Sequence, residues 1–327
     1  MSLPKKCQYE AVAGFFFQSD PATDAAVFDY VSKQASVRSK LVIEALSRMT
    51  KDLGLVAGTP DPIQGTTNST PWHRFTRTLQ RLNDEAPLNA TYHLIYLGRH
   101  GQGWHNVAES KYGTQAWDDH FSKLDSCDGM HFLDARLTET GRQQARLARD
   151  TFSHALAAGL PAPEAYINAT PNPPPSHAIT TLIRAFPNIY IHKLSTKPCH
   201  AIIILAPSKL LTPSKLLREV IGEQTCDKRS PKTEIQARHP DFFVFEQGFA
   251  EDDPFWRPDA RETEVDIDAR MRKFLDEVLG QTYAKQQILS FTAHSGAIAS
   301  ILRVTGHRPF ALQTGGVIPV VVKTIRE

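Results

Sequence analysis

The sequence predicts an α/β protein built on a mostly parallel β-sheet with helices on both faces. From His93 onward, short apolar runs of strand length alternate with longer amphipathic runs, and this alternation is typical of strand–helix–strand units. The composition fits a large folded core, because 41% of the 327 residues are hydrophobic and 22% are charged, close to the averages of globular proteins. In such sheets ligands bind at the carboxyl ends of the strands.

The expected elements follow one another along the chain. Short apolar runs predict strands at 93–98, 165–168, 287–293 and 318–323. Runs with one apolar stripe predict helices at 140–157, 265–279 and 297–303. Thr138 is the expected N-cap of the first of these helices, and Gly141 allows close packing at its start.

The two remaining parts of the chain are less regular. Residues 1–90 are predicted to be an N-terminal extension that packs on or caps the main domain of residues 91–327, and a substrate-shielding lid is the alternative. The extension has helical potential at 24–53 and 72–82, separated by a loop rich in Gly, Pro, Ser and Thr at 58–71. Within the main domain the segment at about 168–213 is atypical, since it begins in a proline-rich stretch and has no clear period.

Charge and cysteine content exclude several classes of protein. The formal net charge of +2 predicts no general attraction to nucleic acid, and no apolar run approaches the roughly 20 residues that cross a bilayer. The N-terminus carries no apolar stretch of signal-peptide length. The four cysteines lie far apart without a CxxC pair, which argues against structural zinc and a disulfide framework. We therefore expect a cytoplasmic protein, with the nucleus as a further location.

The strongest chemical signal is the stretch that follows the predicted strand at 93–98. Arg99 offers a planar fork of donors that matches phosphate oxygens. His100, at the strand end, is a competent nucleophile toward phosphorus when its imidazole is neutral. Gly101 would allow close approach of a phosphate to the backbone, and Asn106 can donate an amide hydrogen bond at a helix N-terminus.

A second strand of the same design lies near the C-terminus. The apolar run at 287–293 ends in His294, which is followed by Ser295, Gly296 and a predicted helix. Two histidines at parallel strand ends can face one crevice, where one attacks and the other stabilises charge. Ser295 is a candidate substrate ligand beside them.

These segments together resemble the histidine phosphatase superfamily, also called the phosphoglycerate mutase-like family, and especially its fungal and plant branch with an RHGxGxHN motif. The matching segments appear in the family's order and are RHGQGWHN at 99–106, DARLTETGRQQA at 134–145, LLRE at 216–219 and AHSGAI at 293–298. The resemblance implies a three-layer α/β/α sandwich and a phosphohistidine intermediate on His100. It also implies phosphate binding by Arg99, Asn106 and His294, with no metal and no cofactor.

The resemblance further implies a carboxylic acid that protonates the leaving oxygen, and Glu219 occupies the matching position. An alkoxide leaves poorly unless it is protonated, and apolar neighbours of Glu219 would favour its neutral form. Glu223, Asp252 and Asp253 are the alternative donors.

One motif of the family is missing from its expected place. After the strand at 165–168 the family has an S-P-x-x-R element whose arginine completes the phosphate pocket, whereas here the nearest substitute is Arg184. Loss of a charged donor from an anion site costs about 3 kcal/mol of transition-state stabilisation, or about a hundredfold in rate.

The sequence therefore favours a phosphomonoester hydrolase that acts on a small phosphorylated substrate. The alternatives are a phosphoglycerate-type mutase and, because of the missing arginine, a catalytically impaired protein that binds or regulates. A zinc site is not favoured, because His100 and His105 have no Asp or Cys at ligand spacing.

Overall fold

A computed structural model describes residues 6–26, 28, 53–56, 69–133, 135–169, 212–238 and 249–327 of the chain. The described residues form one six-stranded sheet with helices on both sides, and a small two-stranded hairpin. No helix within these residues has the length and apolar character needed to cross a membrane.

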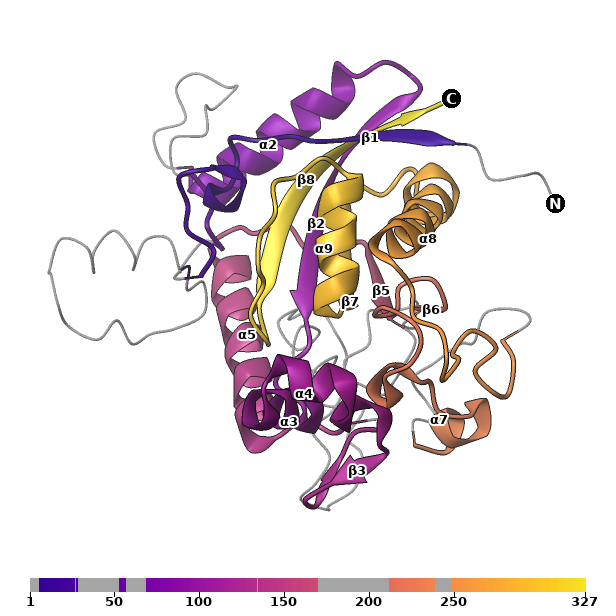
Figure 1. The fold of residues 1–327 in the computed structure, drawn as a ribbon. Coiled ribbons are helices and arrows are strands. Elements are labelled where there is room, and N and C mark those ends of the chain that lie inside the picture. Colours follow the sequence, from indigo (N-terminus) through magenta and orange to yellow (C-terminus); the bar gives the residue numbers. More distant parts are fainter. Residues whose placement is uncertain are drawn as a thin grey trace, which may run out of the picture.

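The large sheet is mostly parallel, as the sequence predicted (Figure 1). Its order is β1 (Cys7–Ala11), β8 (Val317–Arg326), β2 (Ala90–Arg99), β7 (Ile288–Ala293), β5 (Ala165–Ala169) and β6 (Thr212–Ser214). The pairs β2–β7, β7–β5 and β5–β6 are parallel, whereas β8 is antiparallel to both β1 and β2. The sequence analysis predicted β2, β5, β7 and β8 but neither β1 nor β6.

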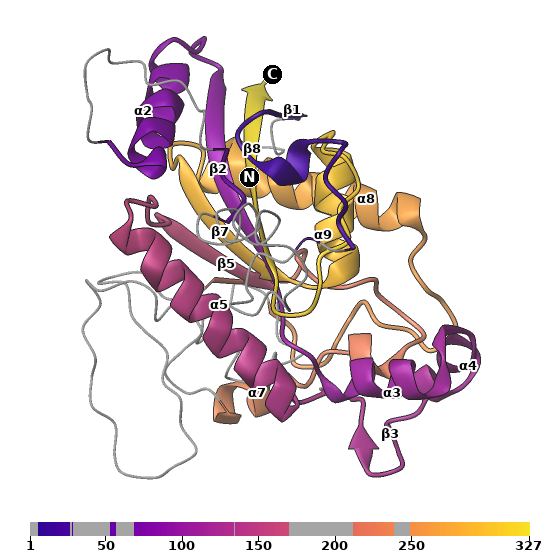
Figure 2. The same ribbon diagram turned by 90° about the vertical axis from the view of Figure 1, so that its left-hand side faces the viewer.

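Helices cover both faces and complete the three layers (Figure 2). On one face lie α2 (Pro71–Asp84) and α5 (Glu139–Ala157), and on the other lie α8 (Glu264–Glu277) and α9 (Ser295–Val304). The three predicted helices of the main domain are confirmed as α5, α8 and α9, with boundaries shifted by one or two residues. A π-helical turn, Val278–Thr282, follows α8 directly.

Short elements lie beyond the carboxyl end of β2 (Figure 1). They are α3 (Trp104–Tyr112), α4 (Thr114–Asp119), the hairpin of β3 (Ser126–Cys127) and β4 (Met130–His131), and, later in the chain, α7 (Lys232–Arg238). The 3-10 turns are Phe17–Ser19, Phe121–Lys123 and Thr225–Asp227. A small separate core of Ala108, Trp117, Met130 and Phe132 packs α3 and α4 against the hairpin.

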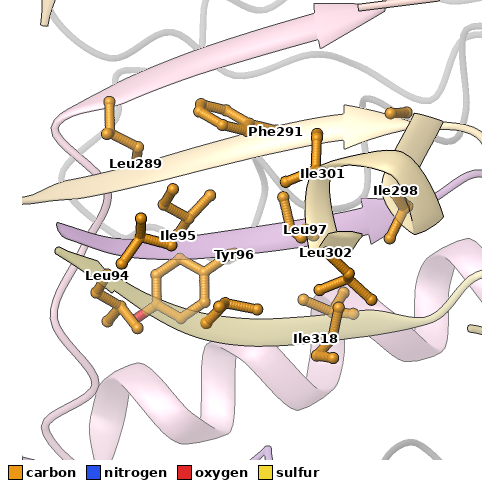
Figure 3. Packing of buried hydrophobic residues seen from close by; sticks show 14 of the residues in the cluster. Leu94, Ile95, Tyr96, Leu97, Leu289, Phe291, Ile298, Ile301, Leu302 and Ile318 are labelled. Carbon is orange, nitrogen blue, oxygen red and sulfur yellow. The ribbon is translucent and has the colours of Figure 1, made fainter. Parts of the chain in front are cut away.

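The main core explains why β2 is apolar on both of its faces. Leu97 pairs in register with Phe291 of β7, so both side chains point to the same face, where Phe291 contacts Phe274 of α8 with ring centroids 5.2 Å apart. Tyr96 points to the opposite face and contacts Phe152 of α5 at 5.3 Å. Figure 3 shows Leu97 and Phe291 packed with Ile298, Ile301 and Leu302 of α9. A strand covered on both sides buries every residue, so it shows no alternation.

The N-terminal residues contribute to both the sheet and the core. β1 pairs with β8 at the sheet edge, and Phe16 packs against Trp72 and Phe75 of α2. The helix predicted at 72–82 is confirmed as α2, whereas the helix predicted at 24–53 and the loop predicted at 58–71 lie almost entirely outside the described residues. The division of the chain at residue 90 stays a prediction. Of the atypical segment at 168–213, only the ends that join β5 and β6 are described.

The loop after β2 packs tightly on the start of α5. Thr138 caps this helix, since its hydroxyl accepts a hydrogen bond from Gly141 N at 3.0 Å. A Cβ on Gly141 would lie 2.1 Å from the Gln102 carbonyl oxygen, and a Cβ on Gly101 would lie 2.3 Å from that of Gly141. Gly101 is therefore required by the backbone of α5, in addition to any role toward a ligand.

We expect Gly141→Ala to lower the free energy of unfolding by about 1–3 kcal/mol, because the added methyl group meets backbone atoms that cannot move independently. Gln143→Ala, on the exposed side of the same helix, is the matched control and should change stability by less than about 0.5 kcal/mol. Urea denaturation of the two variants measures the difference. Equal stabilities would contradict close packing at this position.

Candidate active site

The register of β2 and β7 brings His100 and His294 together. Arg99 is paired with Ala293 at the ends of these parallel strands, so the next residue of each strand leaves the sheet at the same level. The two imidazole centroids are 4.9 Å apart, with ring planes at 59°, and His100 N donates to Ala293 O at 3.3 Å. The two imidazoles are therefore adjacent, and their role as one binding site stays a prediction.

The tautomer of His100 follows from one hydrogen bond. Its Nδ1 lies 2.7 Å from the carbonyl oxygen of Gly101, and a carbonyl can only accept, so Nδ1 carries the proton. The lone pair is then on Nε2. Burial, and next the positive charge of Arg99, lower the pKa of His100 to about 4, against smaller opposing effects of the Gly101 carbonyl and Glu219. The ring is therefore neutral at pH 7.

Arg99 supplies a fixed positive charge beside the histidines. Its Nη1 donates to Leu312 O at 2.8 Å, and its backbone N donates to Gly316 O at 2.8 Å. Burial is the largest cause that lowers the pKa of His100 and His294, and the positive charge of Arg99 lowers both further. Since arginine cannot lose its proton in this range, Arg99 stays charged while the imidazoles stay neutral.

A third imidazole, His105, belongs to the same cluster and was not assigned a role from the sequence. Its ring centroid is 5.3 Å from that of His100, and burial followed by His100 and His294 lowers its pKa well below the usual value. A Cβ on Gly103 would lie 2.7 Å from this ring, so Gly103 makes room for it. The spacing of the glycine and histidine was visible in the sequence, but the direction of the ring was not.

Glu219 lies against the N-terminus of α9, the helix that begins directly after His294. Its carboxylate accepts hydrogen bonds from Ser295 Oγ at 3.2 Å, Gly296 N at 3.0 Å and Ala297 N at 3.2 Å. A Cβ on Gly296 would lie 2.2 Å from Glu219 Oε1, so any other residue here would displace the carboxylate from this position. The predicted donor is thus next to the histidine pair, and Ser295 contacts it.

The alternative donors are less suited to that role. Asp253 forms a two-bonded ion pair with Arg218 at 2.8 and 2.6 Å. Although burial acts to raise the pKa of Asp253, its hydrogen bonds from Arg218 and the backbone hold it below the usual value, so this carboxylate is already paired with Arg218. The backbone N of Glu223 bonds to Arg257 O and the carbonyl of Asp252 accepts from Arg229, and neither residue has a described contact with the histidines.

The remaining predicted site residues have different outcomes. Asn106 caps α3, because its Oδ1 accepts from Gly103 N at 2.9 Å, and its amide NH₂ is left as the donor. Arg184 lies outside the described residues. In the part of the chain that the structure describes, no group of three or more His, Cys, Asp or Glu side chains is arranged to hold a metal ion.

Several known proteins are similar to this chain in sequence or in structure. No protein-family model matches the chain. It is 38% identical over 317 residues to a probable phosphoglycerate mutase of Arthroderma benhamiae, covering 96% of this chain and 84% of the relative. It is 31% identical over 247 residues to the probable phosphoglycerate mutase PMU1 of Saccharomyces cerevisiae, covering 72% and 80%. Among solved structures, mycobacterial glucosyl-3-phosphoglycerate phosphatase Rv2419c with VO3 is 16% identical, with a TM-score of 0.37 over 69% of this chain and 89% of that one.

The buried neutral state of His100 predicts a pH-dependent stability. Since its pKa is lowered to about 4 in the folded chain and is about 6.5 when unfolded, its contribution is present at pH 7 and is lost as pH falls from 6.5 to 4. We expect the stability loss between pH 7 and pH 4.5 to be about 2 kcal/mol smaller in His100→Gln than in the unaltered chain.

Urea denaturation of both proteins at the two pH values measures this difference. The difference between the two proteins removes the effect of groups that titrate in both. One of these is Asp227, whose pKa burial raises to about 7 and which acts in the opposite direction over part of the range. Identical losses in both proteins would show that His100 titrates as an exposed histidine does.

Proposed function

The chain belongs to the phosphoglycerate mutase-like histidine phosphatase superfamily, and from this premise we propose that it is a phosphomonoester hydrolase with a phosphohistidine intermediate on His100. The observation that carries the proposal is the pair of adjacent neutral imidazoles. One of them, His100, has its proton on Nδ1 and therefore a free lone pair on Nε2. A small phosphorylated molecule is the substrate class that such a site would accept.

In the proposed reaction, His100 Nε2 attacks phosphorus while the ester P–O bond breaks. The Nδ1 proton stays on the ring and is held by the Gly101 carbonyl, which offsets the positive charge that develops on the imidazole. Water then attacks the phosphohistidine, the N–P bond breaks, and inorganic phosphate leaves with His100 neutral again. The family resemblance assigns no metal or cofactor to either step.

Charge on the transferring phosphoryl group would be stabilised by donors already in place. Arg99 would supply the fixed positive charge, and His294, His105 and the Asn106 amide are the proposed N–H donors. Donors that are oriented before the reaction need no reorganisation in the transition state. Of this set, His105 is the member that the sequence analysis did not assign to phosphate binding.

Glu219 is the proposed proton donor to the leaving oxygen and then the base for the attacking water. Its position at the start of α9, adjacent to His294, supports this role. A general acid of this kind contributes about 10²–10⁴ in rate.

A phosphoglycerate mutase is the second candidate, favoured by the names of the two relatives from Arthroderma benhamiae and Saccharomyces cerevisiae. A mutase returns the phosphoryl group to its product, whereas a hydrolase passes it to water. Incubation with 3-phosphoglycerate separates the two: we expect release of inorganic phosphate, and isomerisation without release would favour the mutase.

We expect brief incubation with ³²P-labelled substrate to give an acid-labile, base-stable label that maps to His100. His100→Ala should lose the label and lower kcat/KM by on the order of a thousandfold or more, because the nucleophile is removed. His120→Ala, which changes a histidine outside the described cluster, is the control. A label on serine or threonine would contradict the mechanism, and turnover unaffected by His100→Ala would indicate a catalytically impaired protein.

We expect Glu219→Gln to act selectively according to the leaving group. The kcat/KM for an alkyl phosphomonoester such as glycerol 2-phosphate should fall by about 10²–10⁴, because its alkoxide needs a proton. That for p-nitrophenyl phosphate should fall far less, since nitrophenolate leaves without one. Equal losses for the two substrates would argue against Glu219 as the donor.

A further inference from the structure

The segment that carries Glu219 has no regular secondary structure to hold it in place. β6 ends at Ser214, and the next helical turn begins at Thr225. A proton donor must be held within a fraction of an ångström of its productive position. The backbone on either side of Glu219 therefore needs support from another element.

Arg270 of α8 provides contacts to this backbone. Its Nη1 donates to Leu216 O at 2.6 Å and to Arg218 O at 3.1 Å, and its Nη2 donates to Glu219 O at 2.9 Å. One guanidinium group thus binds three carbonyl oxygens within four residues. The planar fork of arginine suits this arrangement, and a lysine ammonium cannot reproduce it.

Glu262 completes the arrangement. Its carboxylate accepts from Arg270 Nε at 2.7 Å and from Nη2 at 2.5 Å, and it also accepts from Ile221 N at 2.9 Å. The Arg270–Glu262 pair therefore binds the segment on both sides of Glu219. The side chains are only 10% and 18% exposed, so these charge-assisted bonds are little weakened by solvent.

The pair also borders a pocket outside the histidine cluster. The pocket has a volume of about 590 Å³, and Lys215, Leu216, Ile221 and Arg261 line it together with Arg270 and Glu262. Its lining does not include the three clustered histidines. The pair thus contacts the segment that carries Glu219 beside this pocket, and it has no described hydrogen bond to the three histidines.

We propose that Arg270 and Glu262 are positioning residues that hold Glu219 as the proton donor at the start of α9. The proposal rests on the proposed phosphohistidine mechanism. In the step concerned, the His100 N–P bond forms, the ester P–O bond breaks, and the carboxyl proton of Glu219 moves to the leaving oxygen. Displacement of the segment would separate the carboxyl group from that oxygen without removing it.

The test compares kcat/KM for glycerol 2-phosphate and p-nitrophenyl phosphate in Arg270→Lys. For each substrate, kcat/KM reports the steps up to phosphorylation of His100, so later hydrolysis of the intermediate does not mask the effect. We expect a loss of about a hundredfold with glycerol 2-phosphate and of less than about threefold with p-nitrophenyl phosphate. Glu262→Gln should give a smaller loss with the same selectivity.

The matched control is Arg303→Lys. Arg303 forms a comparable fork with Asp268 of α8, at 3.0 and 2.7 Å, but it binds α8 to α9 and has no described contact with the Glu219 segment. We expect less than about threefold change with either substrate. A similar selective loss in this control would show that any weakened ion pair on α8 produces the effect.

A double variant separates positioning from general support of the fold. If Arg270 acts through Glu219, then Arg270→Lys should cost little further activity in a Glu219→Gln background. Equal losses for both substrates in Arg270→Lys would overturn the proposal, and so would additive losses in the double variant. If the ³²P label still maps to His100, the phosphohistidine mechanism is unaffected by either result. Absence of the label from the unaltered protein would overturn both.

Discussion

The parallel pairing of β2 with β7 is the constraint on which the candidate site depends. Because Arg99 lies opposite Ala293, His100 and His294 leave the sheet together, and a shift of one residue would send one histidine to the other face. The register is itself fixed by core packing, since Leu97 and Phe291 are fully buried on one face and Tyr96 on the other. Each large apolar side chain contributes about 1.5–3 kcal/mol on burial, so a register shift would cost several kcal/mol. The geometry of the site is thus stabilised by residues that never contact a ligand.

The electrostatics of the site follow from the same burial. Three imidazoles close to an arginine would repel one another if they were protonated, and desolvation is the largest cause that keeps each of them neutral. The result is a permanent positive charge, that of Arg99, beside rings that can donate hydrogen bonds or a lone pair. A phosphoryl group is a strong acceptor that needs both. A site with protonated histidines would attract the same anion but would have no nucleophile.

Local signals predicted much of this arrangement, and long-range contacts limited the rest. The strands and helices of the main domain were visible because each has its own apolar period, and the histidines were visible because each ends such a strand. β6 has three residues and no period, and β1 is recognisable only by its pairing with β8. His105 is part of the motif at 99–106, but the direction of its ring depends on the space left at Gly103. The support of Glu219 by Arg270 joins residues 51 positions apart, and no local pattern marks such a contact.

The place of Glu219 at the start of α9 links its charge to that of the substrate. A helix N-terminus favours an anion, and two backbone N–H groups with the Ser295 hydroxyl now bind the carboxylate there. Under the proposed mechanism, a phosphoryl group beside His294 brings a second negative charge to the same region, and like charges at short range favour the protonated form of one of them. When the proton has moved to the leaving oxygen and the phosphoryl group is on His100, the carboxylate is again an anion at the helix terminus, ready to accept a proton from water.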